Sequence, residues 1–213
     1  MRTEDLVRVL STNHEPVKSG RLRNALAAAL VIGGVAALCL MLATVGPRPD
    51  IATGAHLSFL AFKLAFTVSV VAIGAVFLLR SMFPGRPESR KFVVIFLPLA
   101  AIAVIGVTAL LLTDMRDWGG MLIGTGWAAC LICIPFFAVI PFGALVWALR
   151  KGAPTHLRRT GAAVGLVAGA LGAAAYAFHC PDDSLPFVAI WYGGPVVALA
   201  IVGAILGHRL LRW

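Results

Sequence analysis

Six apolar runs follow one another along this chain, and each is long enough to cross a lipid bilayer as a helix. They occupy residues 24–46, 57–79, 92–112, 121–148, 160–178 and 187–208. A helical crossing requires about 20 mainly apolar residues. Only 13% of the chain is charged, which leaves little polar surface for a water-soluble domain. The sequence therefore predicts an all-α, polytopic membrane protein with a tail over 1–23 and a six-helix transmembrane bundle with short loops over 24–213.

The distribution of basic residues predicts the orientation of this bundle. Fifteen of the 18 Lys and Arg residues lie in the tail, in segments 80–91 and 149–159, and at the C-terminus. On the other side only Arg48 and Arg116 are found. Because cytoplasmic loops carry an excess of Lys and Arg, we expect both termini in the cytoplasm. The net charge of +9 then reflects topology, and no direct contact with nucleic acid is expected.

Three of the four cysteines are expected in the outer half of the bundle. Cys39 lies in the outer half of the first span, and Cys130 lies about nine residues into the fourth, roughly 13 Å deep at about 1.5 Å per residue. Cys130 and Cys133 form a C-x-x-C pattern inside a helix. With no second pair to complete a zinc site, this pattern favours packing.

Cys180 lies in a polar loop, within the segment His179-Cys180-Pro181-Asp182-Asp183. Thiolate, imidazole and carboxylate groups can together ligate a soft or borderline metal. A thiol beside a cationic imidazole also reacts readily with oxidants. A histidine and a cysteine at a helix end can equally well cap and pack. The residues alone leave these three alternatives open.

Lys63 is the only basic residue well inside an apolar run. Charges inside a membrane are candidates for function, but this one is near enough to the outer surface to extend its amine there. We expect it to do so, or to pair with Asp114 or Asp117. The fourth span contains Pro135 and Pro141, which predict a kink.

Glycines recur at intervals of four residues in the last two spans. They are Gly161, Gly165 and Gly169 in the fifth span and Gly203 and Gly207 in the sixth. Small residues at this spacing let helices approach closely. The pattern predicts packing inside the bundle, with a homodimer face as the alternative.

The tail is expected to contain a short amphipathic helix. Thr3 can cap it, Glu4 and Asp5 fall in its first turn, and Leu6, Val9 and Leu10 share one face. Such a face is buried against a bilayer or a partner protein. The two acids make an anionic membrane surface the poorer fit, so the pattern favours a protein partner.

In order and spacing, several of these segments resemble the NrsF-type membrane anti-sigma factors. The resemblance rests on Arg2-Thr3-Glu4-Asp5-Leu6, Arg48-Pro49-Asp50, Phe62-Lys63-Leu64, Cys130, His179-Cys180-Pro181 and Trp191-Tyr192. It implies six helices in a bacterial inner membrane and a cytoplasmic tail that holds an extracytoplasmic-function sigma factor. It also implies that Cys130 and Cys180 sense a metal or oxidative stress, whereas Cys39 and Cys133 match no such role and are assigned to packing.

The sequence thus predicts a regulator and not an enzyme. Its expected sensor residues are Cys130, Cys180, His179 and Asp182, and its expected sigma-factor contacts are Asp5, Leu6, Val9 and Leu10. No cofactor is required, although a metal ion could bind transiently at Cys130 and Cys180. The alternative is a thiol-redox membrane enzyme or a small transporter. The former would be expected to carry its C-x-x-C in a wet loop, and the latter to have polar groups at the midplane and discontinuous helices.

Overall fold

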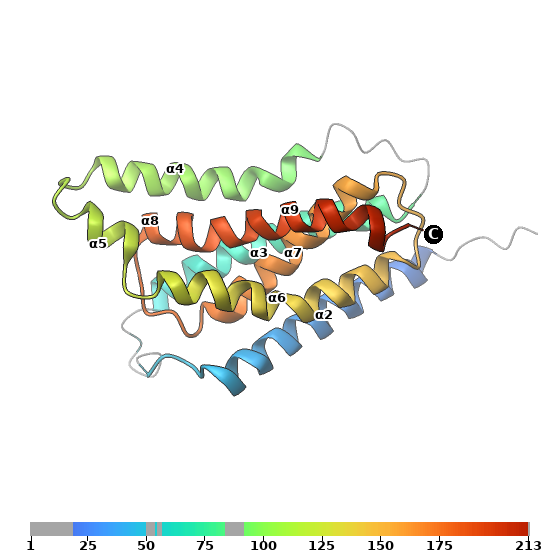
Figure 1. Ribbon diagram of the computed structural model, residues 1–213, viewed down its shortest axis with the longest axis horizontal. Coiled ribbons are helices and arrows are strands. Elements are labelled where there is room, and N and C mark those ends of the chain that lie inside the picture. The colour runs from blue at the N-terminus through green and yellow to red at the C-terminus, as the bar shows by residue number, and fades with distance from the viewer. Residues whose placement is uncertain (1–18, 50–53, 55–56, 84–91, 213) are drawn as a thin grey trace, which may run out of the picture.

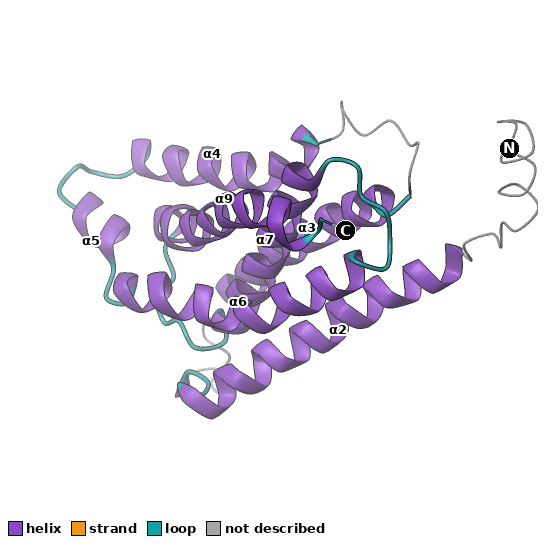
Figure 2. Cartoon of the chain, turned by 45° about the vertical axis from the view of Figure 1, so that its right-hand side comes forward, coloured by secondary structure: helices purple, strands orange, loops and turns teal. Residues whose placement is uncertain are grey.

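The computed structural model describes residues 19–49, 54, 57–83 and 92–212. These residues form helices and connecting loops, and none of them is in a β-strand (Figure 2). The helices are α2 (Ser19–Thr44), α3 (Leu57–Ser81), η2 (Val93–Phe96), α4 (Leu97–Leu111), α5 (Trp118–Ile123), α6 (Trp127–Leu149), α7 (Leu157–Tyr176), α8 (Leu185–Phe187), η3 (Val188–Tyr192) and α9 (Gly193–Leu210). The all-α prediction is confirmed for this part of the chain. The amphipathic helix predicted in the tail lies outside it.

The long helices run back and forth between two ends of an elongated bundle (Figure 1). At one end α2 begins and α9 finishes, and we call it the termini end. At the other end, which we call the Cys180 end, α2 finishes and α7 is followed by a loop over residues 177–184. We call this loop the Cys180 loop. The first described helix therefore begins at the same end of the bundle at which the last described helix finishes.

Five helical segments are long and apolar enough to cross a membrane. They are Gly20–Thr44, Leu57–Ser81, Val93–Leu111, Trp118–Leu149 and Leu185–Leu210. Five of the six predicted spans therefore agree with the structure in both length and composition. The sixth, over 160–178, corresponds to α7, which is not among them.

The exception, α7, is the central helix of the bundle. It contacts α2, α3, α6 and α9, and 15 of its 20 residues are buried. A helix that other helices surround does not need the large apolar side chains that face lipid. Small residues serve it better, because they let its neighbours approach.

The predicted glycine spacing accounts for the contact between α7 and α9. A Cβ atom on Gly165 would collide with the backbone carbonyl of Leu199, and one on Gly203 would collide with the carbonyl of Gly161. The two glycine faces are therefore packed on each other within one chain. The alternative that they form a homodimer face is wrong for this reason.

The fourth predicted span is interrupted, but not at its prolines. Helix α6 continues through Pro135 and Pro141, while the break lies between α5 and α6, at Gly124 with φ +56°. A left-handed φ is easily adopted only by glycine. As a consequence α6 begins at Trp127, and Cys130 lies in its first turn.

Candidate functional site: a buried pair of thiols tied to α2

Cys130 and Cys180 meet at the Cys180 end of the bundle. Cys180 follows α7, where its backbone N–H donates to the carbonyl of Tyr176 at 3.1 Å. Both side chains are fully buried, both thiols are free, and Cys130 is near enough to lower the pKa of the Cys180 thiol. The structure thus brings together the two cysteines that the sequence analysis singled out. They can meet because the break before α6 places Cys130 near the helix end.

Two tyrosines enclose the thiol pair. Tyr176 from α7 and Tyr192 from η3 are both buried, with ring centroids 6.2 Å apart. Tyr192 ends a single π-helical turn, a distortion that is frequent at functional sites. Its hydroxyl faces the Cys180 thiol but makes no well-formed hydrogen bond within the described residues. The thiol pair therefore lies buried beside two aromatic side chains.

A buried ion-pair network holds the Cys180 loop beside the thiol pair. The amine of Lys63 donates to a carboxylate oxygen of Asp183 at 2.9 Å and to the carbonyl of Cys180 at 3.1 Å. The guanidinium of Arg48 contacts the same carboxylate and the same carbonyl, each at 3.2 Å. Two cations, one from the loop after α2 and one from α3, thus bind one carboxylate and one backbone carbonyl.

The prediction for Lys63 is wrong in two respects. Its side chain is fully buried, so it does not extend to the surface, and its partner is Asp183 instead of Asp114 or Asp117. The reason is that α3 packs against α7. The loop that follows α7 therefore comes within reach of a lysine two turns inside α3.

The charges of this network affect groups in the Cys180 loop. Partial burial would raise the pKa of Asp183, but hydrogen bonds from Arg48 and Lys63 outweigh it and lower that pKa. The pKa of the Cys180 thiol is also lowered. The hydrogen bond from Cys130 is the main cause, and the nearby charge of Lys63 adds to it against the effect of burial. The Cys180 thiol therefore ionises more readily than an ordinary cysteine, which favours its reaction with oxidants.

His179 and Asp182 were predicted to join the cysteines, but their side chains bind neighbouring loops. The Nδ1 atom of His179 lies 2.9 Å from the carbonyl oxygen of Gly46. Asp182 accepts hydrogen bonds from the backbone N–H groups of Thr125 at 2.9 Å and Gly126 at 2.7 Å, which secures the break before α6. Both residues therefore position the backbone around the thiols.

The donor groups at this site do not fit a closed metal site. Among the described residues no group of three or more His, Cys, Asp or Glu side chains could hold a metal ion. A structural zinc site requires four ligands, and here two thiols converge while the nearest imidazole and carboxylate have other partners. The remaining cysteines take no part: Cys133 is half-buried against the core, and Cys39 is exposed on α2, so the packing predicted for Cys39 does not occur within the chain.

The Cys180 loop is also tied to the end of α2. The backbone N–H of Arg48 donates to the carbonyl of Phe178 at 2.9 Å, next to the contact between His179 and Gly46. Together with the Arg48 side chain, these bonds join the segment just after α2 to the loop that carries Cys180. Because α2 is one continuous helix from Ser19 to Thr44, this connection extends to the termini end.

The sequence analysis placed Asp183 in the polar segment around Cys180 and used Arg48 for the family resemblance, but it predicted neither the ion pairs of these two residues nor a role for Tyr176. One signal could have pointed to Asp183: a lysine buried in an apolar run requires a nearby anion, and the polar loops offered five aspartates. Choosing among them required knowledge of which helices are neighbours.

Comparison with known proteins places this arrangement in a family. Residues 10–213 match the family described as NrsF, negative regulator of sigma F. The chain is 31% identical to the probable anti-sigma-F factor NrsF of Azospira oryzae and 34% identical to the anti-sigma-F factor NrsF of Caulobacter vibrioides, in each case over the full length of both chains. No solved structure matches it. The names of these relatives are those of regulators, in agreement with the expectation that the chain is not an enzyme. With the match covering nearly all of its residues, this chain belongs to the NrsF family.

Proposed function

We propose that this chain is an anti-sigma factor of the bacterial inner membrane, which sequesters an extracytoplasmic-function sigma factor at the cytoplasmic side. The observation that carries the proposal is its full-length similarity to two proteins named as anti-sigma-F factors. Five apolar helices support a membrane location. The excess of Lys and Arg at the termini end favours an orientation with that end in the cytoplasm.

In this orientation the thiol pair is buried at the periplasmic end of the bundle, and the periplasm is a compartment where disulfides can form. The thiolate of Cys180 attacks an oxidant such as a peroxide, which is reduced to water as the sulfur becomes a sulfenic acid. The thiol of Cys130 then displaces a second water molecule and closes a disulfide. Two thiols are thereby oxidised and one peroxide is reduced. A soft metal ion bound by the two thiolates is a second signal of the same class.

Access to the thiols is what couples the signal to the rest of the molecule. Both cysteines are fully buried, so no oxidant or metal reaches them until the Cys180 loop moves away. That loop is bonded to the segment after α2 through Arg48 and His179. A reacted pair cannot return to the original packing, and the displaced loop shifts α2 toward the state that releases the sigma factor.

The proposed contact with the sigma factor is the apolar face of the tail, formed by Leu6, Val9 and Leu10 and preceded by Asp5. The test is co-purification of tagged extracytoplasmic-function sigma factors of the source bacterium with the full-length chain. We expect one of them to be retained, and the variant Leu6→Glu/Leu10→Glu to lose it while remaining in the membrane fraction. The matched control is Ser11→Glu/Thr12→Glu, which adds the same charge on the opposite face. Retention of no sigma factor by the unmodified chain would overturn the proposed function.

A further inference from the structure

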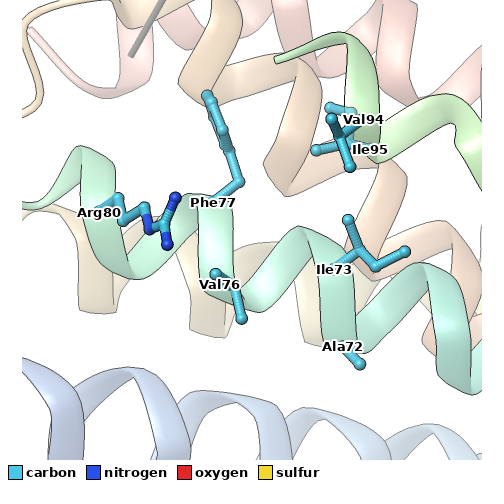
Figure 3. Close-up of a pocket in the computed structure, with 7 residues that line it drawn as sticks. All are labelled: Ala72, Ile73, Val76, Phe77, Arg80, Val94 and Ile95. Carbon is cyan, nitrogen blue, oxygen red and sulfur yellow. The ribbon is translucent and has the colours of Figure 1, made fainter. Parts of the chain in front are cut away.

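A groove between α3 and η2 opens on the surface of the bundle near the termini end. It encloses about 420 Å³. Ala72, Ile73, Val76 and Phe77 of α3 form one wall, and residues of η2 form the other (Figure 3). Val76 and Val94 are about half exposed, so the groove is open to whatever surrounds the helices.

Among the described residues that line the groove, Arg80 in the last turn of α3 is the only charged one. Figure 3 shows its guanidinium turned along the helix toward Phe77. This guanidinium makes no ion pair or hydrogen bond with any described residue, and its side chain is exposed. A cation at one end of an otherwise apolar groove favours an amphiphile with a negatively charged head.

A second arginine lies close to the same end of the groove. Phe77 packs edge-on against Phe92, with ring centroids 5.5 Å apart. The guanidinium of Arg159, in the first turn of α7, lies over the ring of Phe92, 5.9 Å from the ring centroid. A second cation therefore lies beside Phe92, whose ring packs on the Phe77 side chain of the groove wall.

The length of the groove matches one leaflet of a bilayer. From Ala72 to Arg80 the helix rises about 12 Å at about 1.5 Å per residue. The hydrocarbon layer of one leaflet is about 15 Å thick, half of the roughly 30 Å core. A lipid whose acyl chain fills the groove from Ala72 toward Arg80 would thus have its phosphate at the level of Arg80. Arginine binds phosphate with two parallel hydrogen bonds, and basic sites between membrane helices bind anionic lipid heads.

We propose that this groove is a binding site for one anionic phospholipid, with an acyl chain between α3 and η2 and the phosphate bound by Arg80. The inference rests on the membrane location in the proposed function but not on sigma-factor binding or on the thiols. Its tests therefore use lipid binding as the readout, and that measurement can fail while sigma-factor binding succeeds.

The test is native mass spectrometry of the full-length protein in detergent, titrated with phosphatidylglycerol or with phosphatidylcholine of the same chains. We expect one phosphatidylglycerol to bind in preference to phosphatidylcholine. Arg80→Gln should weaken phosphatidylglycerol binding about tenfold, because one charge-assisted contact is lost. The matched control is Arg23→Gln, an exposed arginine of α2 at the same end, which should leave binding unchanged.

A second variant tests the apolar part of the site. Ala72→Phe adds a large side chain at the end of the groove opposite Arg80 and should release the lipid. Ala103→Phe, which changes an exposed alanine of α4 outside the groove, should not. Soluble glycerol phosphate should fail to displace the lipid, since it lacks the acyl chain. Equal binding of the two lipids, equal effects of Arg80→Gln and Arg23→Gln, or displacement by glycerol phosphate would each overturn the proposal.

Discussion

Replacing Lys63 with methionine tests whether the ion-pair network holds the Cys180 end together. Methionine keeps most of the length and the apolar stem of the side chain but removes the cation from a fully buried site. Removing one partner of a buried ion pair costs about 3–5 kcal/mol. Here Arg48 still contacts Asp183 at 3.2 Å, so the lower end of that range, about 3 kcal/mol, is expected. For a chain of this size that lowers the melting temperature by about 6–12 °C.

The assay is thermal unfolding of the full-length protein in detergent. Arg21→Met, which removes an exposed cation of α2, is the matched control and should change the free energy of unfolding by less than about 0.5 kcal/mol. The double variant Lys63→Met/Asp183→Asn should lose less than the sum of the two single variants, because the second change removes an anion that the first leaves partly unpaired. Strict additivity, or a Lys63→Met shift no larger than the control, would refute the network.

Three further predictions concern packing, pH and orientation. Gly165→Ala should greatly reduce the yield of folded protein, because the new methyl group meets the carbonyl of Leu199; Gly143→Ala, with nothing within 4 Å, is its control in size-exclusion chromatography. Because the pKa of Asp183 is lowered, its contribution to stability is complete above its ordinary pKa of 3.8 and is lost as the pH falls below that value. The melting temperature of Asp183→Asn should therefore change less with acid pH than that of the unmodified protein. Reporter fusions after residues 50, 116 and 183 should be periplasmic and those after 86 and 155 cytoplasmic; a cytoplasmic signal after 183 would contradict the charge-based orientation.

The fold was largely predictable because hydrophobic length is a local property. Apolar runs of about 20 residues mark the helices whatever their neighbours are, and glycines spaced four apart marked the contact between α7 and α9. The sequence did not predict the break before α6. Its two prolines predict a kink inside the run, yet helix α6 continues through both, while the chain breaks at Gly124, where φ is +56° and Asp182 binds the adjacent N–H groups.

The site was predictable only in part, because it depends on which helices are neighbours. Cys130 and Cys180 were selected through the family resemblance, and the structure places them in contact. The sequence order His179-Cys180-Pro181-Asp182 suggested that all its polar groups act together. In the folded chain the cysteine points inward, while His179 and Asp182 bind backbone groups of other loops. The partner of Lys63 depends on the packing of α3 against α7, which no local pattern encodes.

The most direct test of the account is the response of sigma-factor-dependent transcription to a peroxide or a thiophilic metal in cysteine variants of the full-length chain. If Cys130 and Cys180 act as one sensor, then Cys130→Ser, Cys180→Ser and the double variant should lose the response to the same extent, since removing either thiol removes the pair. Cys133→Ser, a half-buried cysteine one turn away in α6, should respond like the unmodified protein. A full response in Cys180→Ser would contradict the account and assign both cysteines to helix packing.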